Sequence, residues 1–204
     1  MIIYLKYLFS LSIVLFLSGC ATHPVSLSPS ISYNKLELNE KFDSTAGLYI
    51  PKKLLNKKLE ESTGGDKISY YPYRDIQPIL IKTLSASFKK IKTTTKKNDN
   101  SVEYNFVPSI KTFVTEKSTL FWPPKGFKVA MDIAVYSKGN YITTIDVSGL
   151  GEALSNEFMS DFNFSTKKAV ENAIFNFQQN LQTNSFLQKI PRYTRSLYKD
   201  KMIT

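Results

Sequence analysis

Few residues of this chain could do chemistry, and one cysteine and one histidine are the most reactive of them. The 204 residues contain a single cysteine, Cys20, and a single histidine, His23. A lone cysteine has no partner for an intramolecular disulfide, and a lone histidine beside it provides neither a catalytic triad nor a metal site. Four roles are open to Cys20: a core residue, a metal ligand, a nucleophile, or the first residue of the mature protein. The residues on either side of Cys20 distinguish between these roles.

The segment before Cys20 has the pattern of an export signal. One positive charge, Lys6, precedes an apolar run over residues 7–17 that only two serines interrupt. This run is shorter than the roughly 20 apolar residues that span a bilayer. It is followed by the small pair Ser18-Gly19, as signal peptides are before their cleavage site. The pattern predicts a signal peptide over residues 1–19.

Residues 17–20, LSGC, resemble the lipobox of bacterial lipoproteins. The resemblance implies cleavage between Gly19 and Cys20, a diacylglyceryl group on the cysteine sulfur, and the membrane as a partner through this anchor. Ala21, where aspartate would favour the inner membrane, favours the cell outer membrane, with the protein facing the periplasm. An ordinary signal peptide with a chance cysteine and an uncleaved anchor helix are the alternatives.

Three regions follow the signal. Residues 20–45 contain prolines among serines and no sustained apolar period. This composition predicts a flexible tether after the lipidated cysteine. His23 lies within this tether and is expected to be solvated. Residues 46–190 have the length of a single domain. Residues 191–204 form a basic, aromatic tail that either frays or contacts acidic head groups.

The apolar periods within the domain predict strands and helices. Period-two and continuous apolar runs indicate strands near 46–50, 68–71, 102–114, 127–135 and 141–147, and period-3.6 runs indicate helices over 75–91 and from a cap near Ser165 to Leu181. A helical turn or two is expected around Leu54, Leu55 and Leu59. Pro108 places its strand at an edge or a bulge, residues 137–140 form a hairpin turn, and Gly149 and Gly151 suggest a bulge. The predicted fold class is α+β, an antiparallel sheet of about four to five strands with two helices packed on one face.

This order of elements resembles the YajG-like bacterial lipoprotein family and, more loosely, the TolB amino-terminal domain and lipoprotein activators of cell-wall synthases. The likeness rests on the lipobox, an early strand, the helix reaching Phe88 and Ile91, the meander, the exit at residues 148–153 and a closing helix on Ala169. It implies a periplasmic interaction domain with no catalytic residues to carry over.

The chain is strongly basic, with a formal charge of +10. Only three of its 27 basic residues are arginines, the residue best suited to bidentate phosphate and base contacts, and an exported protein meets little DNA or RNA, so no nucleic-acid partner is expected. An AT-rich coding bias explains the many lysines and asparagines; attraction to anionic lipid, lipopolysaccharide or acidic proteins is the alternative.

Two segments are candidate interfaces. The connection TLFWPPKG, residues 119–126, carries Phe121 and the single tryptophan, Trp122, stiffened by Pro123 and its neighbour; the aromatics either close the open end of the sheet or form an exposed docking tip. In residues 70–75, YYPYRD, Tyr71, Tyr73 and Arg74 are either wedged between helix and sheet or form a contact patch.

The sequence contains no recognisable catalytic motif, and we expect no catalytic residue, metal or cofactor. The leading interpretation is a membrane-anchored periplasmic lipoprotein that acts as a non-enzymatic binding or accessory component of a cell-envelope assembly, with an envelope protein as partner. A lipid- or lipopolysaccharide-handling auxiliary lipoprotein of an envelope transport system is the alternative. An enzyme acting on cell-wall or lipid substrates would lack the necessary constellation of residues.

Overall fold

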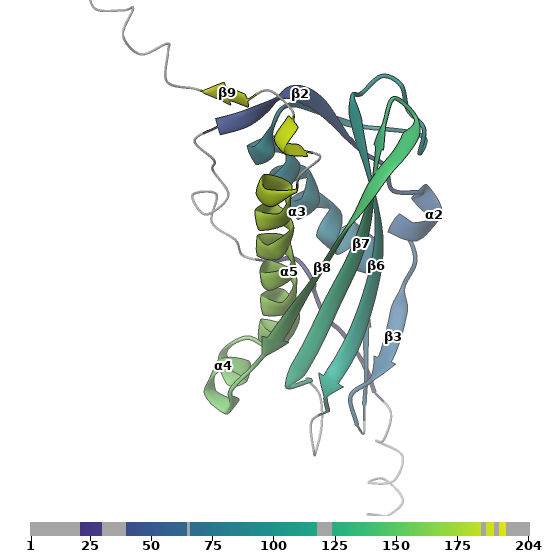
Figure 1. Cartoon of the computed structure of the whole chain (residues 1–204). Helices are drawn as coiled ribbons and strands as arrows, with labels where there is room; N and C mark the ends of the chain where they lie inside the picture. The colour runs from purple at the N-terminus through teal and green to yellow at the C-terminus, as the bar shows by residue number, and fades with distance from the viewer. Residues whose placement is uncertain are drawn as a thin grey trace, which may run out of the picture.

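The computed structural model describes residues 21–29, 40–64, 66–117, 124–184, 187–189 and 192–194. The fold is α+β, with two mixed sheets and a layer of helices (Figure 1). Its elements in chain order are β1 (Thr22–Pro24), β2 (Glu40–Leu48), α2 (Lys52–Leu55), β3 (Leu59–Ser62), β4 (Lys67–Tyr70), α3 (Pro72–Ser87), β5 (Phe88–Thr93), β6 (Tyr104–Glu116), β7 (Gly126–Ser137), β8 (Asn140–Glu152), α4 (Ser155–Ser160), α5 (Phe164–Thr183), the 3₁₀ helix η2 (Leu187–Lys189) and β9 (Arg192–Thr194).

The larger sheet has the strand order β5-β2-β6-β7-β8, with β9 pairing antiparallel to β2. The meander β6-β7-β8 is antiparallel, as predicted, and its hairpin turns at Lys138 and Gly139, both with positive φ. However, β2 is parallel to both β5 and β6, so the expectation of a purely antiparallel sheet is wrong. The chain reaches β5 from β2 through α3, and such a crossover returns it to the sheet in the same direction.

The predicted helix over 75–91 is in fact a helix followed by a strand. Helix α3 ends at Ser87, and Phe88 already has extended backbone angles, φ −116° and ψ 151°. Phe88 is buried against Phe42 and Phe106, with ring centroids 5.0 and 5.5 Å away. Similarly, Leu59 belongs to strand β3 and not to a helical turn.

The smaller sheet, β1-β4-β3, includes the first part of the predicted tether. Strand β1 runs parallel to β4, Val25 N–H donates to Ser69 O at 2.9 Å, and Val25 and Leu27 are buried in the core. The predicted tether over 20–45 is therefore not free over residues 22–29, and β2 begins at Glu40, before the expected Ala46. The start of the predicted tail, residues 192–194, likewise pairs with β2.

Helices α3 and α5 pack against each other and cover one face of the larger sheet, as predicted (Figure 1). The inward side chains of β7 and the apolar stripe of α5 are fully buried. Phe106 of β6 and Phe177 of α5 meet edge to face, with centroids 6.3 Å apart. This contact joins the sheet and helix layers into one core.

Gly149 and Gly151 do not form the predicted bulge. Both stay in register on β8, opposite Val129 and Phe127 of β7. A Cβ on either glycine would run into the backbone of α5, and at Gly149 even the third-nearest atom, the carbonyl carbon of Asn172, would be 2.9 Å away. The glycines therefore allow the helix to lie directly on the strand.

Pro108 marks a sheet edge, as predicted. The pairing of β2 with β6 ends at Leu48 and Phe106, and among the described residues no further strand pairs with β6 on this side beyond that point. Pro108 has no N–H to leave unpaired. Farther along, the N–H of Ile110 donates to the Tyr73 hydroxyl at 3.0 Å and that of Val114 to the Glu61 carboxylate at 2.9 Å. Side chains thus cover an edge that would otherwise invite another strand.

Candidate functional site

The predicted anchor and one predicted interface lie outside the described residues, but their neighbours are described. Gly19 and Cys20 are followed by Ala21, whose carbonyl oxygen accepts the Lys67 N–H at 3.0 Å. Residues 118–123, including Phe121, Trp122 and Pro123, are followed by Pro124, whose carbonyl oxygen accepts the Ser165 hydroxyl at 2.8 Å.

Of the predicted patch Tyr71, Tyr73 and Arg74, little faces solvent. The ring of Tyr73 is buried, and its hydroxyl accepts the Ile110 N–H at the edge of β6. This residue therefore has a structural role. Arg74 stacks on the half-buried Tyr71 ring, with the guanidinium carbon 3.7 Å from the ring centroid, and its Nε lies 3.4 Å from Asp75 Oδ1. Arg74 alone offers a well-exposed side chain, which makes the patch small.

One end of the molecule brings together several strand ends and helix α4. We call it the anchor end: it comprises Ala21, Lys67, the end of β6, the start of β7, and the end of β8 with α4. In the larger sheet Gly126 pairs with Glu116 and Glu152, and in the smaller sheet Thr22 pairs with Lys67. Glu61, which pairs with Ile68 beside Lys67, accepts the Val114 N–H near the end of β6 and so brings the two sets of strand ends together. Figure 1 shows α4 and the tips of β3 and β6 at this same end.

At the anchor end, three large apolar side chains in and beside α4 are exposed, and the sequence reasoning missed them. Leu154 is 69% exposed, Met159 71% and Phe162 45%. We call these three residues the apolar corner. The available signal was four large apolar residues within nine positions, Leu154, Phe158, Met159 and Phe162, in a short segment between the last strand and the start of the closing helix.

The apolar corner is held by a hydrogen-bonded frame. Glu157 closes it, because its carboxylate accepts the Leu154 N–H at 2.9 Å and its carbonyl accepts the Asp161 N–H at 3.0 Å. Lys167 Nζ lies 2.8 Å from Asp161 Oδ2, and this hydrogen bond lowers the pKa of Asp161. Asn163 accepts the Ser26 N–H at 2.9 Å. The exposure of the corner is thus built into the fold.

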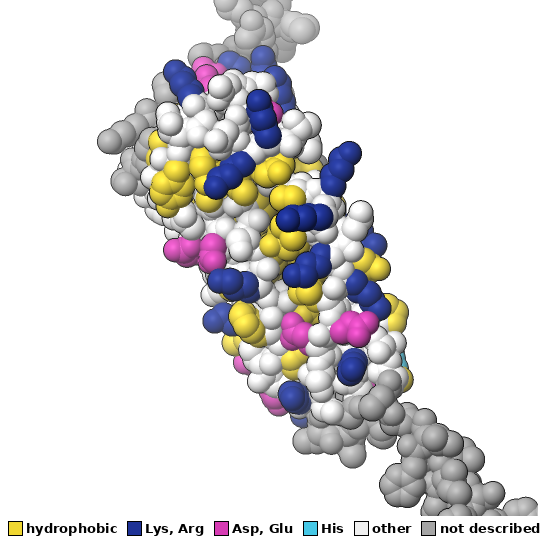
Figure 2. Space-filling model, turned by 90° about the vertical axis from the view of Figure 1, so that its right-hand side faces the viewer, with side chains coloured by type: hydrophobic (Ala, Val, Ile, Leu, Met, Phe, Trp, Pro, Cys, Tyr) yellow, Lys and Arg dark blue, Asp and Glu magenta, His cyan; other side chains and the backbone are white. Residues whose placement is uncertain are grey.

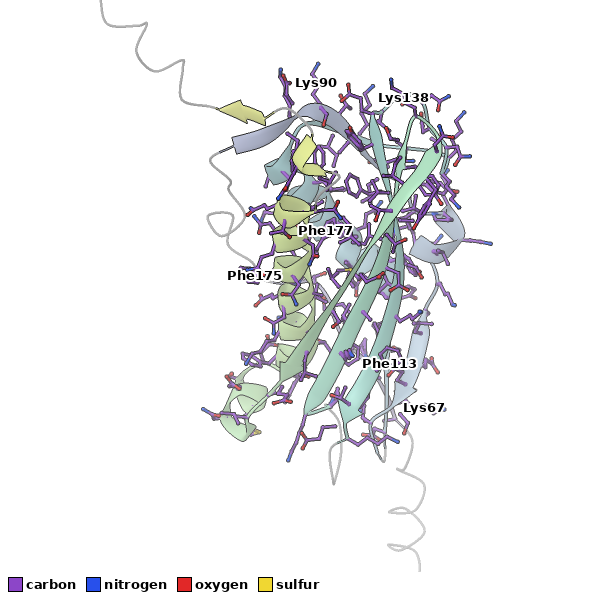
Figure 3. All side chains as sticks on the ribbon, viewed as in Figure 1. Lys67, Lys90, Phe113, Lys138, Phe175 and Phe177 are labelled. Atoms are coloured by element: carbon purple, nitrogen blue, oxygen red, sulfur yellow. The ribbon has the colours of Figure 1, made fainter. Side chains whose placement is uncertain are left out.

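The opposite end of the molecule is rich in lysine. We call the exposed residues Lys90, Lys92, Lys96, Lys97 and Lys138 the basic pole. Figure 3 shows Lys90 and Lys138 at the end of the molecule opposite Lys67. On the face drawn in Figure 2, lysine and arginine side chains are spread along the whole molecule with hydrophobic side chains between them, so basic charge is not confined to the pole.

A buried asparagine fixes the loop that carries two of these lysines. The amide nitrogen of Asn105 donates to Lys96 O at 3.0 Å and to Lys97 O at 2.8 Å, while its oxygen accepts the Thr94 hydroxyl at 2.8 Å. Asp43 pairs with Lys89 at 2.7 Å next to the pole. The pole therefore has a defined backbone.

Two polar side chains, His23 and Glu61, hold elements of the fold together. His23, expected to be solvated, lies in β1 with Nε2 3.0 Å from Asp66 Oδ2, a pair that ties β1 to the turn before β4. The Glu61 carboxylate accepts hydrogen bonds from the Tyr70 and Thr112 hydroxyls. Burial, aided by this carboxylate, raises the pKa of Tyr70 above its usual range. The network joins the two sheets.

Two searches over the described part of the chain gave negative results. No group of three or more histidine, cysteine or acidic residues there is arranged to hold a metal ion. No helix in the same residues combines the length and hydrophobicity needed to cross a membrane.

No protein-family model matches the chain, and neither does any curated protein. Among solved structures, the chain resembles the crystal structure of protein XCC0632 from Xanthomonas campestris, of the DUF330 family, with a TM-score of 0.38 and 10% sequence identity. That likeness covers 81% of this chain and 100% of the other. At this score and identity it bears on neither the fold nor the function of this chain.

Proposed function

We propose that the protein is a lipoprotein of the bacterial envelope, anchored through Cys20 at the outer membrane and facing the periplasm, where it acts as a non-enzymatic binding or accessory component. The observation that carries this proposal is the signal-like segment that ends in LSGC at residues 17–20. Lys6, the short apolar run and the small pair before the cysteine occur together in the order that lipoprotein export requires.

The arrangement after Cys20 is compatible with this role. The chain enters the fold at Ala21, so a lipidated cysteine would hold the domain close to the membrane. Holding it there raises its effective concentration for a partner on the same surface. The engagement of Glu61, His23 and Asp66 in contacts between strands favours a binding role over catalysis.

The basic pole supports an acidic partner. Five exposed lysines, on strand β5, the loop that follows it and the β7–β8 turn, would attract an acidic envelope protein or an anionic head group, with a strength that falls as salt rises. The same observation supports the second candidate, a lipid- or lipopolysaccharide-handling auxiliary lipoprotein of an envelope transport system, because lipopolysaccharide phosphates are anionic.

Mass spectrometry of the natural amino terminus tests the anchor. We expect a peptide that begins at Cys20 and carries acyl chains, and we expect Cys20→Ser to abolish acylation and membrane flotation. A natural product with a free thiol, or with residues 1–19 still attached, would refute the proposal.

Detergent extraction distinguishes the two candidates. Under the leading proposal, an envelope protein co-purifies with the acylated protein at low salt and is lost when Lys96 and Lys97 are both changed to glutamate. Lipopolysaccharide or phospholipid recovered with the protein in its place would favour the auxiliary role. The matched control is Lys52→Glu with Lys53→Glu on α2, which removes equal charge outside the pole.

A further inference from the structure

The link between the proposed lipid anchor and the folded domain is very short. Ala21 is already held by the domain through its hydrogen bond with Lys67, and β1 begins at the next residue. Cys20 directly precedes Ala21, and consecutive Cα atoms are about 3.8 Å apart. A lipid on Cys20 would therefore begin about one residue from the folded surface.

The apolar corner lies near this point of entry. From Ala21 the chain reaches Ser26, whose N–H donates to Asn163 at 2.9 Å. Five residues span at most about 18 Å when fully extended. Asn163, which directly follows Phe162 of the corner, therefore lies within about 20 Å of the entry of the chain. Figure 1 places α4 at the same end of the molecule as the tip of β3, next to which β4 begins.

We propose that the apolar corner is a second membrane contact. On the anchored protein, Leu154, Met159 and Phe162 enter the head-group region of the leaflet that holds the Cys20 lipid. This inference rests on the proposed lipidation of Cys20, because the lipid brings that leaflet to this end of the domain.

The chemistry of the corner fits a lipid surface. Large, highly exposed apolar side chains gain free energy when they leave water for the acyl boundary, and a contact of this kind adds to the hold of the acyl chains. Of the two acids within the corner, Asp161 has its charge balanced by Lys167, and the Glu157 carboxylate is turned to the Leu154 backbone N–H.

The same contact orients the domain. Strand β7 runs from Gly126 at the anchor end to Ser137 at the hairpin turn, and at about 3.3 Å per residue it is about 36 Å long. With the corner on the leaflet, the hairpin residue Tyr141 and the basic pole are held away from it.

Quenching by lipid-borne nitroxides tests the contact in the acylated full-length protein. An acylated Cys20 leaves no thiol, so each introduced cysteine is a unique site for a bimane label. We choose Met159→Cys in the corner, Phe175→Cys on the outer face of α5 (Figure 3) and Tyr141→Cys at the hairpin, whose native side chains are 71%, 55% and 59% exposed. Each protein is reconstituted in phosphatidylethanolamine–phosphatidylglycerol vesicles with and without doxyl-labelled phospholipid.

We expect strong quenching at position 159, weak quenching at 175 and none at 141. Equal quenching at the three positions, or none at 159, in vesicles where the protein floats and its acyl chains are seen by mass spectrometry, would overturn the membrane contact and leave the proposed anchor standing. Absence of acyl chains would instead refute the proposed function, and the contact with it.

A longer link provides the matched control. A flexible insert of ten Gly/Ser residues between Cys20 and Ala21 keeps the anchor and the corner but removes the short link. If the corner binds lipid by itself, position 159 stays quenched. Loss of quenching at 159 in this variant would refute the corner's own affinity for lipid.

Discussion

Helix α5 lies on β8 at a place with no room for a side chain, and one added methyl group tests whether this contact stabilises the fold. In Gly149→Ala the new Cβ would fall inside the van der Waals envelope of the Ala169 carbonyl oxygen and the Ala173 nitrogen. It would also lie 2.9 Å from the Asn172 carbonyl carbon, whereas ordinary contacts begin at 3.4 Å. All three atoms belong to helix backbone, so no side-chain rotation can relieve the clash.

The size of the effect follows from the movement that the methyl group forces. Helix and strand must separate by roughly 1 Å, and a gap of 0.5 to 1 Å forfeits about a quarter to a half of the dispersion energy of the atoms facing it. The fully buried side chains Val170, Ile174 and Phe177 belong to the same helix and would move with it. Overpacking typically costs about 1–3 kcal/mol, and alanine recovers about 0.4–1 kcal/mol by restricting the unfolded chain. We expect a net loss of about 1–2 kcal/mol.

Urea unfolding followed by circular dichroism measures this loss. Ser148→Ala is the matched control, because its side chain is exposed on the other face of the same strand, and we expect its free energy of unfolding to change by less than about 0.5 kcal/mol. A Gly149→Ala protein as stable as this control would refute the close approach of α5 to β8.

Two further changes test the buried polar groups. Burial raises the pKa of Tyr70, so its contribution is complete below the unfolded pKa of about 10 and is lost as the pH rises above it, at about 1.4 kcal/mol per pH unit. Between about pH 9 and pH 11, the stability advantage of the wild type over Tyr70→Phe in urea unfolding should therefore shrink by about 1.4 kcal/mol, and a constant difference would contradict the raised pKa. Asn105→Ala removes the donor to the Lys96 and Lys97 carbonyls and should cost about 1–3 kcal/mol in urea unfolding and speed amide exchange in the β5–β6 loop, while exposed Asn98→Ala should do neither.

The elements that sequence reasoning predicted correctly are those whose signal is local. The meander β6-β7-β8 follows from period-two patterns and a two-residue turn at Lys138-Gly139, and α5 follows from one apolar stripe. Strand β5 was missed for a physical reason. Phe88 lies four positions after Leu84, so the sequence places both residues on one helix face. In the structure Phe88 is extended and fills a core position next to the end of α3, a position that a strand residue fills as well as a helical one.

Strand β1 and the apolar corner were missed because both depend on distant partners. Three residues of β1 have no period of their own, and they are ordered by residues 67–69, more than 40 positions away. The corner stays exposed because Glu157 accepts the backbone N–H groups of Leu154 and Asp161. These hydrogen bonds form a short, self-contained turn of chain before α5 begins. By contrast, the expected patch at Tyr71, Tyr73 and Arg74 was hypothesised from composition alone, and the edge of β6 takes up Tyr73.

The loss of the expected tether changes how such a protein would find a partner. A flexible link of roughly 20 residues would have let the domain sample a shell about 60 Å deep in any orientation. Because the chain is bound into the fold from Ala21, the reach of a protein anchored at Cys20 would be set by the domain itself, whose strand β7 is about 36 Å long. A short link restricts orientation as well as distance, and the effective concentration at a partner that matches that height rises accordingly. If Cys20 carries the proposed lipid, the basic pole at the other end of these strands would lie about 36 Å from the anchoring leaflet. An acidic partner at that height would then gain most from the short link, whereas a partner on the leaflet itself would be out of reach of the pole in this orientation.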